Sequence, residues 1–145
     1  MSWRDVVWKK IVNVTLINKD NKLLEATLIS SDESERFREF AEIEIESEFF
    51  NEKYAEENYF DALLALRKEL ENLHILIQCN GAGLNIYPSA MQQSMGTGRT
   101  AYVLNMGEQG KMKNVVDIFD YNTTLNFVTI EEQKNYFNQW LSSLG

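Results

Sequence analysis

Two runs of alternating apolar and polar residues near the start of the chain constrain its fold most. Residues 11–17 and 23–29 both alternate and are rich in branched side chains, which is the pattern of half-buried β-strands. The polar segment 18–22 lies between them and has the composition of a turn. The sequence therefore predicts an antiparallel hairpin with a five-residue loop.

Three later segments carry apolar residues at steps of three and four, the spacing of a helix face. A capping-box pattern at 30–33 precedes segment 31–50, which we expect to be a helix, although residues 42–46 also alternate like a strand. The clearest apolar stripe spans residues 59–73. A second capping box at 129–132 predicts a last helix with an apolar face near the end of the chain.

Strand patterns dominate between the second and the last of these helices. They lie at 74–79, 84–87, 100–106 and 115–120. The first two are separated by a glycine-containing turn, which predicts a second hairpin that ends at Pro88, and residues 89–95 are expected to form one or two helical turns. Segregated strands and helices indicate an α+β fold with antiparallel sheet. One proline and no Gly/Ser-rich linker favour a single domain over residues 1–145.

The net charge of −8 comes from one segment of the chain. Residues 31–72 hold 14 acidic and five basic residues, whereas the remainder is nearly neutral. This charge repels phosphate backbones, so we expect no nucleic-acid partner and favour a protein with a basic surface.

The cellular location is predicted from what the sequence lacks. Cys79 is the one cysteine, so it cannot form a disulfide within the chain, and the first residues lack the apolar core of a secretory signal. No apolar run approaches the ~20 residues of a membrane helix. We therefore expect a cytoplasmic protein without membrane contact.

No pattern in the sequence predicts catalysis, a metal or a cofactor. His74 and Cys79 are five residues apart on a predicted strand, which places them on opposite faces and roughly 16 Å apart. They are also the only His and Cys residues, too few for a zinc site, and the acidic residues do not form a calcium loop. Nucleotide-binding and serine-hydrolase motifs are absent. We expect a non-enzymatic protein.

Two sets of residues are candidates for binding. The first is acidic and would contact a partner protein, although such a run of glutamates also fits a solvated face. It comprises Glu42, Glu44, Glu46, Glu48, Glu52 and Tyr54. The second surrounds Gly96 to Thr100, whose amides and arginine could receive an anion, although the segment also fits a flexible turn. This alternative ligand pocket comprises Asn80, Tyr87, Ser89, Arg99 and Tyr102.

The middle third of the chain resembles a family of small bacterial proteins. The matching segments are Cys79-Asn80-Gly81-Ala82, Tyr87-Pro88-Ser89-Ala90-Met91, Met95-Gly96-Thr97-Gly98, Ala101-Tyr102 and Val116-Asp117-Ile118-Phe119-Asp120. The chain departs from the family pattern at Ala90, where the family favours glycine, which bears on the turn after Ser89. The family is that of immunity proteins of polymorphic toxin and contact-dependent growth inhibition systems.

This resemblance implies a protein that binds a cognate toxin, such as a nuclease, blocks its active surface and uses no cofactor. The alternative is a small-ligand-binding protein or enzyme that uses the segment Asn80–Tyr102. A structural or regulatory subunit unrelated to toxins is a third hypothesis.

Overall fold

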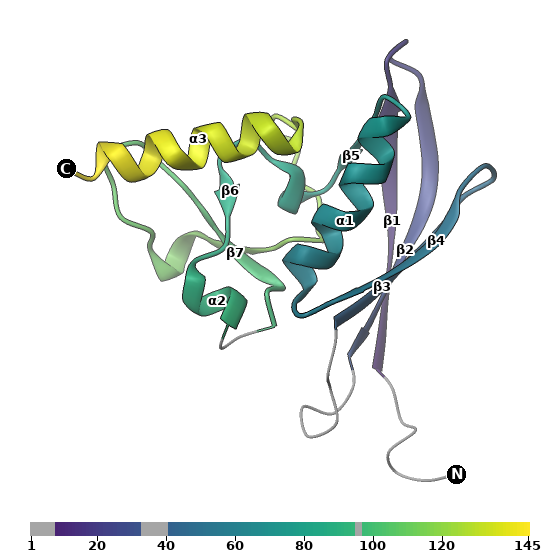
Figure 1. Ribbon diagram of the computed structural model, residues 1–145, viewed down its shortest axis with the longest axis horizontal. Helices are drawn as coiled ribbons and strands as arrows, with labels where there is room; N and C mark the ends of the chain where they lie inside the picture. Colours follow the sequence, from purple (N-terminus) through teal and green to yellow (C-terminus); the bar gives the residue numbers. More distant parts are fainter. Residues whose placement is uncertain (1–7, 33–40, 95–96) are drawn as a thin grey trace, which may run out of the picture.

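The computed structural model of the protein describes residues 8–32, 41–94 and 97–145. They form an α+β fold with a five-stranded antiparallel sheet, in the order β4-β3-β2-β1-β5, and a three-stranded sheet, β6-β7-β8 (Figure 1). The strands are β1 (Trp8–Asn18), β2 (Leu23–Asp32), β3 (Ala41–Glu46), β4 (Asn51–Glu56), β5 (Ile75–Gln78), β6 (Ile86–Tyr87), β7 (Thr100–Val103) and β8 (Val115–Asp117). The helices are α1 (Tyr59–Asn72), α2 (Ala90–Ser94) and α3 (Ile130–Ser143), with short 3-10 turns at η2 (Asn80–Ala82) and η3 (Met112–Asn114).

The first predicted hairpin is confirmed. Strands β1 and β2 pair antiparallel from Trp8 opposite Asp32 to Ile17 opposite Leu23. The side chain of Asn18 closes the loop, because its Oδ1 accepts hydrogen bonds from the backbone N–H groups of Asp20 and Lys22, both at 2.9 Å. This local acceptor replaces the ladder hydrogen bonds that the backbone loses in the loop.

The helix predicted over residues 31–50 is wrong for every part of it that the structure describes. Residues 41–46 form β3, which pairs with β2 and with β4, while residues 33–40 lie outside the described residues. Ile43 and Ile45 are completely buried, and the glutamates between them point to the other face. Burial of alternate isoleucines therefore outweighs the helix preference of glutamate, a weak local term.

Helix α1 confirms the clearest predicted helix and covers one face of the five-stranded sheet (Figure 1). Asn58 caps it, since its Oδ1 accepts a hydrogen bond from Asp61 N at 2.9 Å. Leu63, Leu66 and Leu70 are 0% exposed and pack into the core between helix and sheet. The face of the sheet under α1 is called the inner face below.

The second predicted hairpin is wrong, although both of its strands exist. Strand β5 pairs with β1, and β6 pairs with β7 in the other sheet. The turn η2 separates them and lies so close to α1 that a Cβ on Gly81 would be 2.4 Å from Leu63 Cδ2. This close approach sends the chain out of the first sheet and into the second.

Helix α3 begins with the predicted capping box, in which the side chains and backbones of Thr129 and Glu132 exchange hydrogen bonds. It runs along the three-stranded sheet, with its first turn beside the end of α1 and its last turn pointing away from β1–β4 (Figure 1). Among the described residues, no helix is long and apolar enough to cross a membrane.

Candidate functional site

The outer face of the five-stranded sheet, opposite α1, is the main candidate surface. Side chains alternate along each strand, so the residues between the buried ones form this face. On β1 to β4 it consists of Lys9, Ile11, Asn13, Thr15, Ile17, Leu23, Glu25, Thr27, Ile29, Ser31, Glu42, Glu44, Glu46, Asn51, Lys53 and Ala55. No helix of the described chain covers it (Figure 1).

A column of carboxylates runs along β3 on the outer face. Glu42, Glu44 and Glu46 follow one another at two-residue steps, roughly 7 Å apart for an extended strand. In the strand register only one basic residue faces the column, because Lys53 lies opposite Glu44. The column is therefore an excess of negative charge on a half-exposed surface.

The end of this column borders an acidic groove of about 790 Å³. It is lined by Asn13, Glu25, Ala26, Thr27, Glu44, Glu46, Ser47, Glu48 and Asn51. Four of these residues are glutamates and none is basic, so the groove presents several carboxylates to one incoming group. A concave surface lined by a single sign of charge strengthens the local field and concentrates ions of opposite charge.

The β3–β4 turn that forms one end of the groove is held in place by Ser47. Its Oγ accepts a hydrogen bond from Phe50 N at 2.9 Å and donates one to Phe50 O at 2.9 Å, and Ser47 N donates to Asn51 Oδ1 at 3.1 Å. Phe49 stands at the tip of this turn with 48% of its surface exposed. The turn thus offers an aromatic side chain beside the carboxylates.

Two pairs of apolar residues interrupt the polar side chains on the outer face, Ile17 with Leu23 near the hairpin loop and Ile11 with Ile29. Ile11 lies directly opposite Ile29 in the β1–β2 register, and Ile29 lies opposite Glu44. Ile11 is 63% exposed, so most of this side chain is available for contact with a partner. Protein interfaces combine an apolar core with a polar rim, and these apolar residues could form part of such a core.

The acidic residues predicted to bind a partner are divided between the two faces. Glu42, Glu44 and Glu46 lie together on the outer face and Glu48 lies in the adjoining turn. Glu52 and Tyr54 pair with the buried Ile45 and Ile43, so they belong to the inner side of the edge strand β4.

The side chain of Tyr54 is engaged with α1. Its hydroxyl donates a 2.5 Å hydrogen bond to Glu69 Oε2, and partial burial together with this carboxylate raises the pKa of Tyr54. Tyr54 therefore acts as a contact between β4 and α1.

Sequence reasoning missed Glu25 and Ile11 as members of this surface. Glu25 and Ile11 lie on the first hairpin, outside the acidic segment 31–72. Glu25 shares the groove lining with Glu44, and Ile11 lies on β1 with Ile29 of β2 between it and Glu44. The alternation of residues 11–17 contained the signal, since it placed Ile11 on the polar side of its strand.

The alternative ligand pocket is also divided, and two of its residues meet at Asp117. Arg99 Nε donates to Asp117 Oδ2 at 3.1 Å, and Asn80 Nδ2 donates to the Asp117 carbonyl at 3.0 Å. The Arg99 guanidinium also lies 5.3 Å from the ring centroids of both Tyr59 and Phe119. Arg99 is thereby held by a carboxylate and two rings between α1 and the second sheet.

The other three residues of that pocket lie together elsewhere. Tyr87, Ser89 and Tyr102 line a mainly apolar groove of about 460 Å³ beside α3.

His74 and Cys79 form no catalytic pair. Cys79 is 0% exposed, and burial raises the pKa of its thiol to about 12, partly opposed by the nearby charge of Arg67. His74 is exposed at the end of α1 in a left-handed conformation with φ 60°. A thiol that stays protonated in the core is not available as a nucleophile.

The described residues contain no group of three or more His, Cys, Asp or Glu side chains arranged to hold a metal ion. No protein-family model matches the chain, and a comparison with curated proteins finds no match either.

Proposed function

We propose that this protein is a cytoplasmic, non-enzymatic binding protein whose outer face docks against a basic protein, and that this partner is a bacterial toxin which it inhibits. The observation that carries the proposal is the acidic groove, where four glutamates from three segments face one hollow without a basic neighbour in its lining. The toxin is the partner that the resemblance to immunity proteins implies.

The charge of the outer face supports a fast and selective encounter. Complementary charges raise association rates more than they raise final affinity, and they exclude partners of like charge. An acidic face disfavours nucleic acid and suits a protein that itself binds phosphates. A nuclease, whose substrate-binding surface is basic, meets this description.

The apolar residues on the same surface supply the contacts that slow dissociation. Ile11 and Phe49 are exposed by 63% and 48%. Phe49 follows Glu48 in the β3–β4 turn, and Ile11 lies on the outer face with Ile29 between it and Glu44. A few buried apolar and aromatic anchors carry most of the binding energy in protein interfaces. We infer that the partner places apolar side chains between its basic ones.

Inhibition follows from occlusion in this proposal. A basic surface covered by the outer face is no longer accessible to a phosphate-bearing substrate, so the inhibitor needs no reaction of its own. Glu42, Glu44 and Glu46 form the steering column, and the turn around Phe49 provides the anchor.

The first experiment is a pull-down with the tagged protein from the producing bacterium in low salt, followed by identification of the retained proteins. We expect one toxin fragment in stoichiometric amount, whose activity the protein suppresses. The association rate of that fragment is then measured with the wild type and with the reversal E42K/E44K/E46K.

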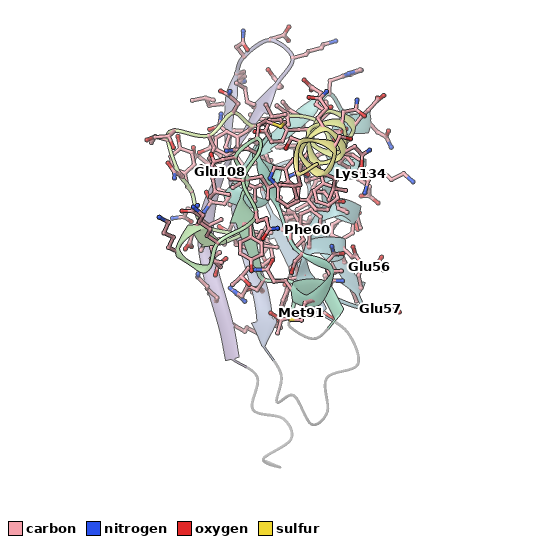
Figure 2. The ribbon with its side chains drawn as sticks, turned by 90° about the vertical axis from the view of Figure 1, so that its left-hand side faces the viewer. Glu56, Glu57, Phe60, Met91, Glu108 and Lys134 are labelled. Atoms are coloured by element: carbon pink, nitrogen blue, oxygen red, sulfur yellow. The ribbon has the colours of Figure 1, made fainter. Side chains whose placement is uncertain are left out.

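The matched control reverses three exposed glutamates away from the outer face, E57K/E108K/E131K, with the same change in net charge. Figure 2 looks from the α3 side of the molecule and labels Glu57 and Glu108 there. The outer-face variant should associate at least tenfold more slowly than the control. Equal rates for the two variants would refute the assignment of the face.

A further inference from the structure

The apolar groove beside α3 is a second concave surface, separate from the outer face. It is lined by Tyr87, Pro88, Ser89, Ala90, Tyr102, Leu104, Gln109, Gly110, Phe137, Trp140, Leu141 and Leu144. Three segments build it: the chain from β6 into α2, the chain from β7 to Gly110, and one side of α3. Its volume of about 460 Å³ falls within the range of small-molecule sites.

Stacked aromatic rings form one wall of the groove and give it a fixed shape. The rings of Tyr87 and Phe137 stack with centroids 4.0 Å apart and an interplanar angle of 15°, and Phe137 and Trp140 are 5.9 Å apart at 25°. Trp140 is held in turn, because its Nε1 donates a 2.8 Å hydrogen bond to the Glu108 carbonyl. The wall is therefore a rigid apolar surface rather than a loose collection of side chains.

Two leucines near the end of α3 form an exposed apolar part of the groove lining. Leu141 and Leu144 are 48% and 38% exposed, and both belong to the groove lining. Phe137, Leu141 and Leu144 follow one another at steps of four and three residues, which places them on one stripe of the helix. The stripe continues the apolar wall toward the end of α3.

A lysine stands at the other end of this stripe. Lys134 Nζ lies 5.2 Å from the ring centroids of both Tyr87 and Phe137, and it donates a 3.2 Å hydrogen bond to Tyr87 Oη. The ion pairs of the described residues involve Lys10 and Arg99 with Asp117 and Asp120, so no described carboxylate neutralises Lys134 at salt-bridge distance. Figure 2 shows Lys134 beside α3, which is viewed nearly along its axis.

The stripe on α3 therefore changes from charged at Lys134, next to the groove lining, to apolar at Leu144 within it. Ten residues separate Lys134 from Leu144, which is about 15 Å of helix. Lys134 is a cation on a strongly acidic protein and lies over two of the rings that line the groove. This arrangement is complementary to an anion that carries an apolar tail. A neutral apolar compound would not pair with the charge of Lys134, and a short inorganic anion would not reach the leucines.

From this charge complementarity, we propose that the groove beside α3 binds a small amphiphilic carboxylate of the medium-chain fatty acid type. The carboxylate lies at Lys134 and accepts a hydrogen bond from its ammonium group. The tail lies against Phe137, Leu141 and Leu144 and covers the two exposed leucines. Tyr87, Ser89 and Tyr102 belong to this site, whereas Asn80 and Arg99 do not.

The test uses decanoate as the probe, kept below the concentration at which it aggregates, and follows amide shifts of the full-length protein by NMR. We expect saturable binding of one decanoate, with shifts that centre on α3 and residues 87–90. The variant L141N should bind about tenfold more weakly, because a buried leucine contact is lost. The control L73N removes a leucine that is 51% exposed at the end of α1, and should bind like the wild type.

The role of Lys134 is tested with decanol, which has the same tail without the charge. We expect the wild type to prefer decanoate, and K134Q to lose about threefold in decanoate affinity while its decanol affinity is unchanged. Absence of saturable decanoate binding, equal affinity of L141N and wild type, or an unchanged preference in K134Q would each overturn the proposal. So would a dimer in sedimentation experiments that L141N converts to a monomer, since the groove would then be filled by a second copy of the chain.

Discussion

Arg67 of α1 donates a 2.6 Å hydrogen bond from Nη1 to Oε1 of Gln133 in α3, and both side chains are almost fully buried. The amide nitrogen of Gln133 donates in turn to the carbonyls of Gly81, Gly83 and Ile86, at 2.8, 2.9 and 2.9 Å. Desolvation lowers the pKa of Arg67, yet its guanidinium is satisfied by these groups and by the Val128 carbonyl. This polar network joins α3 and the second sheet to α1.

Because of this network, we expect Q133L to lower the free energy of unfolding strongly. The leucine removes one hydrogen bond from each of the three buried carbonyls and one from the Arg67 guanidinium, so we expect a loss of about 3 kcal/mol in the free energy of unfolding. The measurement is urea denaturation followed by circular dichroism. Q139L, on an exposed position of the same helix, is the matched control and should change stability by less than about 0.5 kcal/mol.

A double-mutant cycle with R67M identifies the coupling between the two residues. R67M/Q133L should lose clearly less than the sum of the single variants, because removing both partners leaves fewer unsatisfied groups than removing one. Additive losses would show that the 2.6 Å hydrogen bond contributes nothing of its own.

Asp117 is predicted to join the two sheets through its carboxylate. Its Oδ2 accepts hydrogen bonds from Lys10 of β1 and Arg99, both at 3.1 Å, and its Oδ1 accepts one from Phe119 N. D117N should lose about 2 kcal/mol of stability, since hydrogen bonds to charged groups are strong and this carboxylate is only 21% exposed.

The neighbouring Asp120 provides the matched control. It also pairs with Lys10, at 3.2 Å, but its side chain is 54% exposed. D120N should therefore cost less than about 0.5 kcal/mol in the same chemical denaturation. If D117N and D120N had equal small effects, the carboxylate would not join the sheets.

Sequence reasoning predicted those parts of the fold in which a local pattern determines the element. The first hairpin, α1 and α3 have alternation, an apolar stripe and a capping box within one short window, and each forms as expected. The segment 42–46 had two conflicting patterns. Its alternating isoleucines belong to a strand that pairs with β2, where Glu44 lies opposite Ile29. These two residues are 15 positions apart, so a short sequence window does not contain both.

The sequence predicted the charge of the candidate site but not all of the residues that form it. The excess of acidic residues in 31–72 indicated the sign of the surface, whereas Glu25 and Ile11 joined it through strand pairing. Arg99 appeared available for an anion because the sequence does not show Asp117 beside it. A pattern within one sequence does not show which residues are distant along the chain but close in space.

The buried thiol of Cys79 is expected to make the protein less stable at alkaline pH. Burial raises the pKa of its thiol from 9.0 to about 12 in the folded state, so between these values the unfolded chain loses the proton while the folded protein keeps it. The free energy of unfolding therefore falls as pH rises above 9, by about 1 kcal/mol at pH 10. The measurement is urea unfolding at pH 7 and pH 10.

The variant C79A separates this effect from other groups that titrate in the same range. It should be less stable than the wild type at pH 7, because a small cavity replaces the sulfur, but it should lose less stability between pH 7 and pH 10. The thiol of the native wild type should also react with an aromatic disulfide reagent only as fast as the protein unfolds. Rapid reaction of the native thiol at pH 8 would contradict its burial.

The charged residues on the edge strand β4 are expected to prevent self-association of the protein. Its backbone pairs with β3 on one side only, and the five-stranded sheet ends there. Glu52 and Glu56 lie on one face of the strand and Lys53 on the other, and all three are exposed. In an antiparallel pair of two β4 strands centred on Tyr54, Glu52 of each copy would lie opposite Glu56 of the other. Like charges directly opposite each other destabilise such a pair.

Replacing these three charges by threonine, in E52T/K53T/E56T, removes the repulsion and raises the β-propensity of an open edge. We expect the variant to form dimers and larger species as its concentration rises, measured by sedimentation velocity, while the wild type keeps a constant sedimentation coefficient. The control E57T/K68T/E131T also removes two acidic charges and one basic charge, but at exposed positions outside β4, and should behave like the wild type. Association of both variants to the same extent would assign the effect to net charge, whereas association of the β4 variant alone identifies the strand edge as the surface that its charges protect.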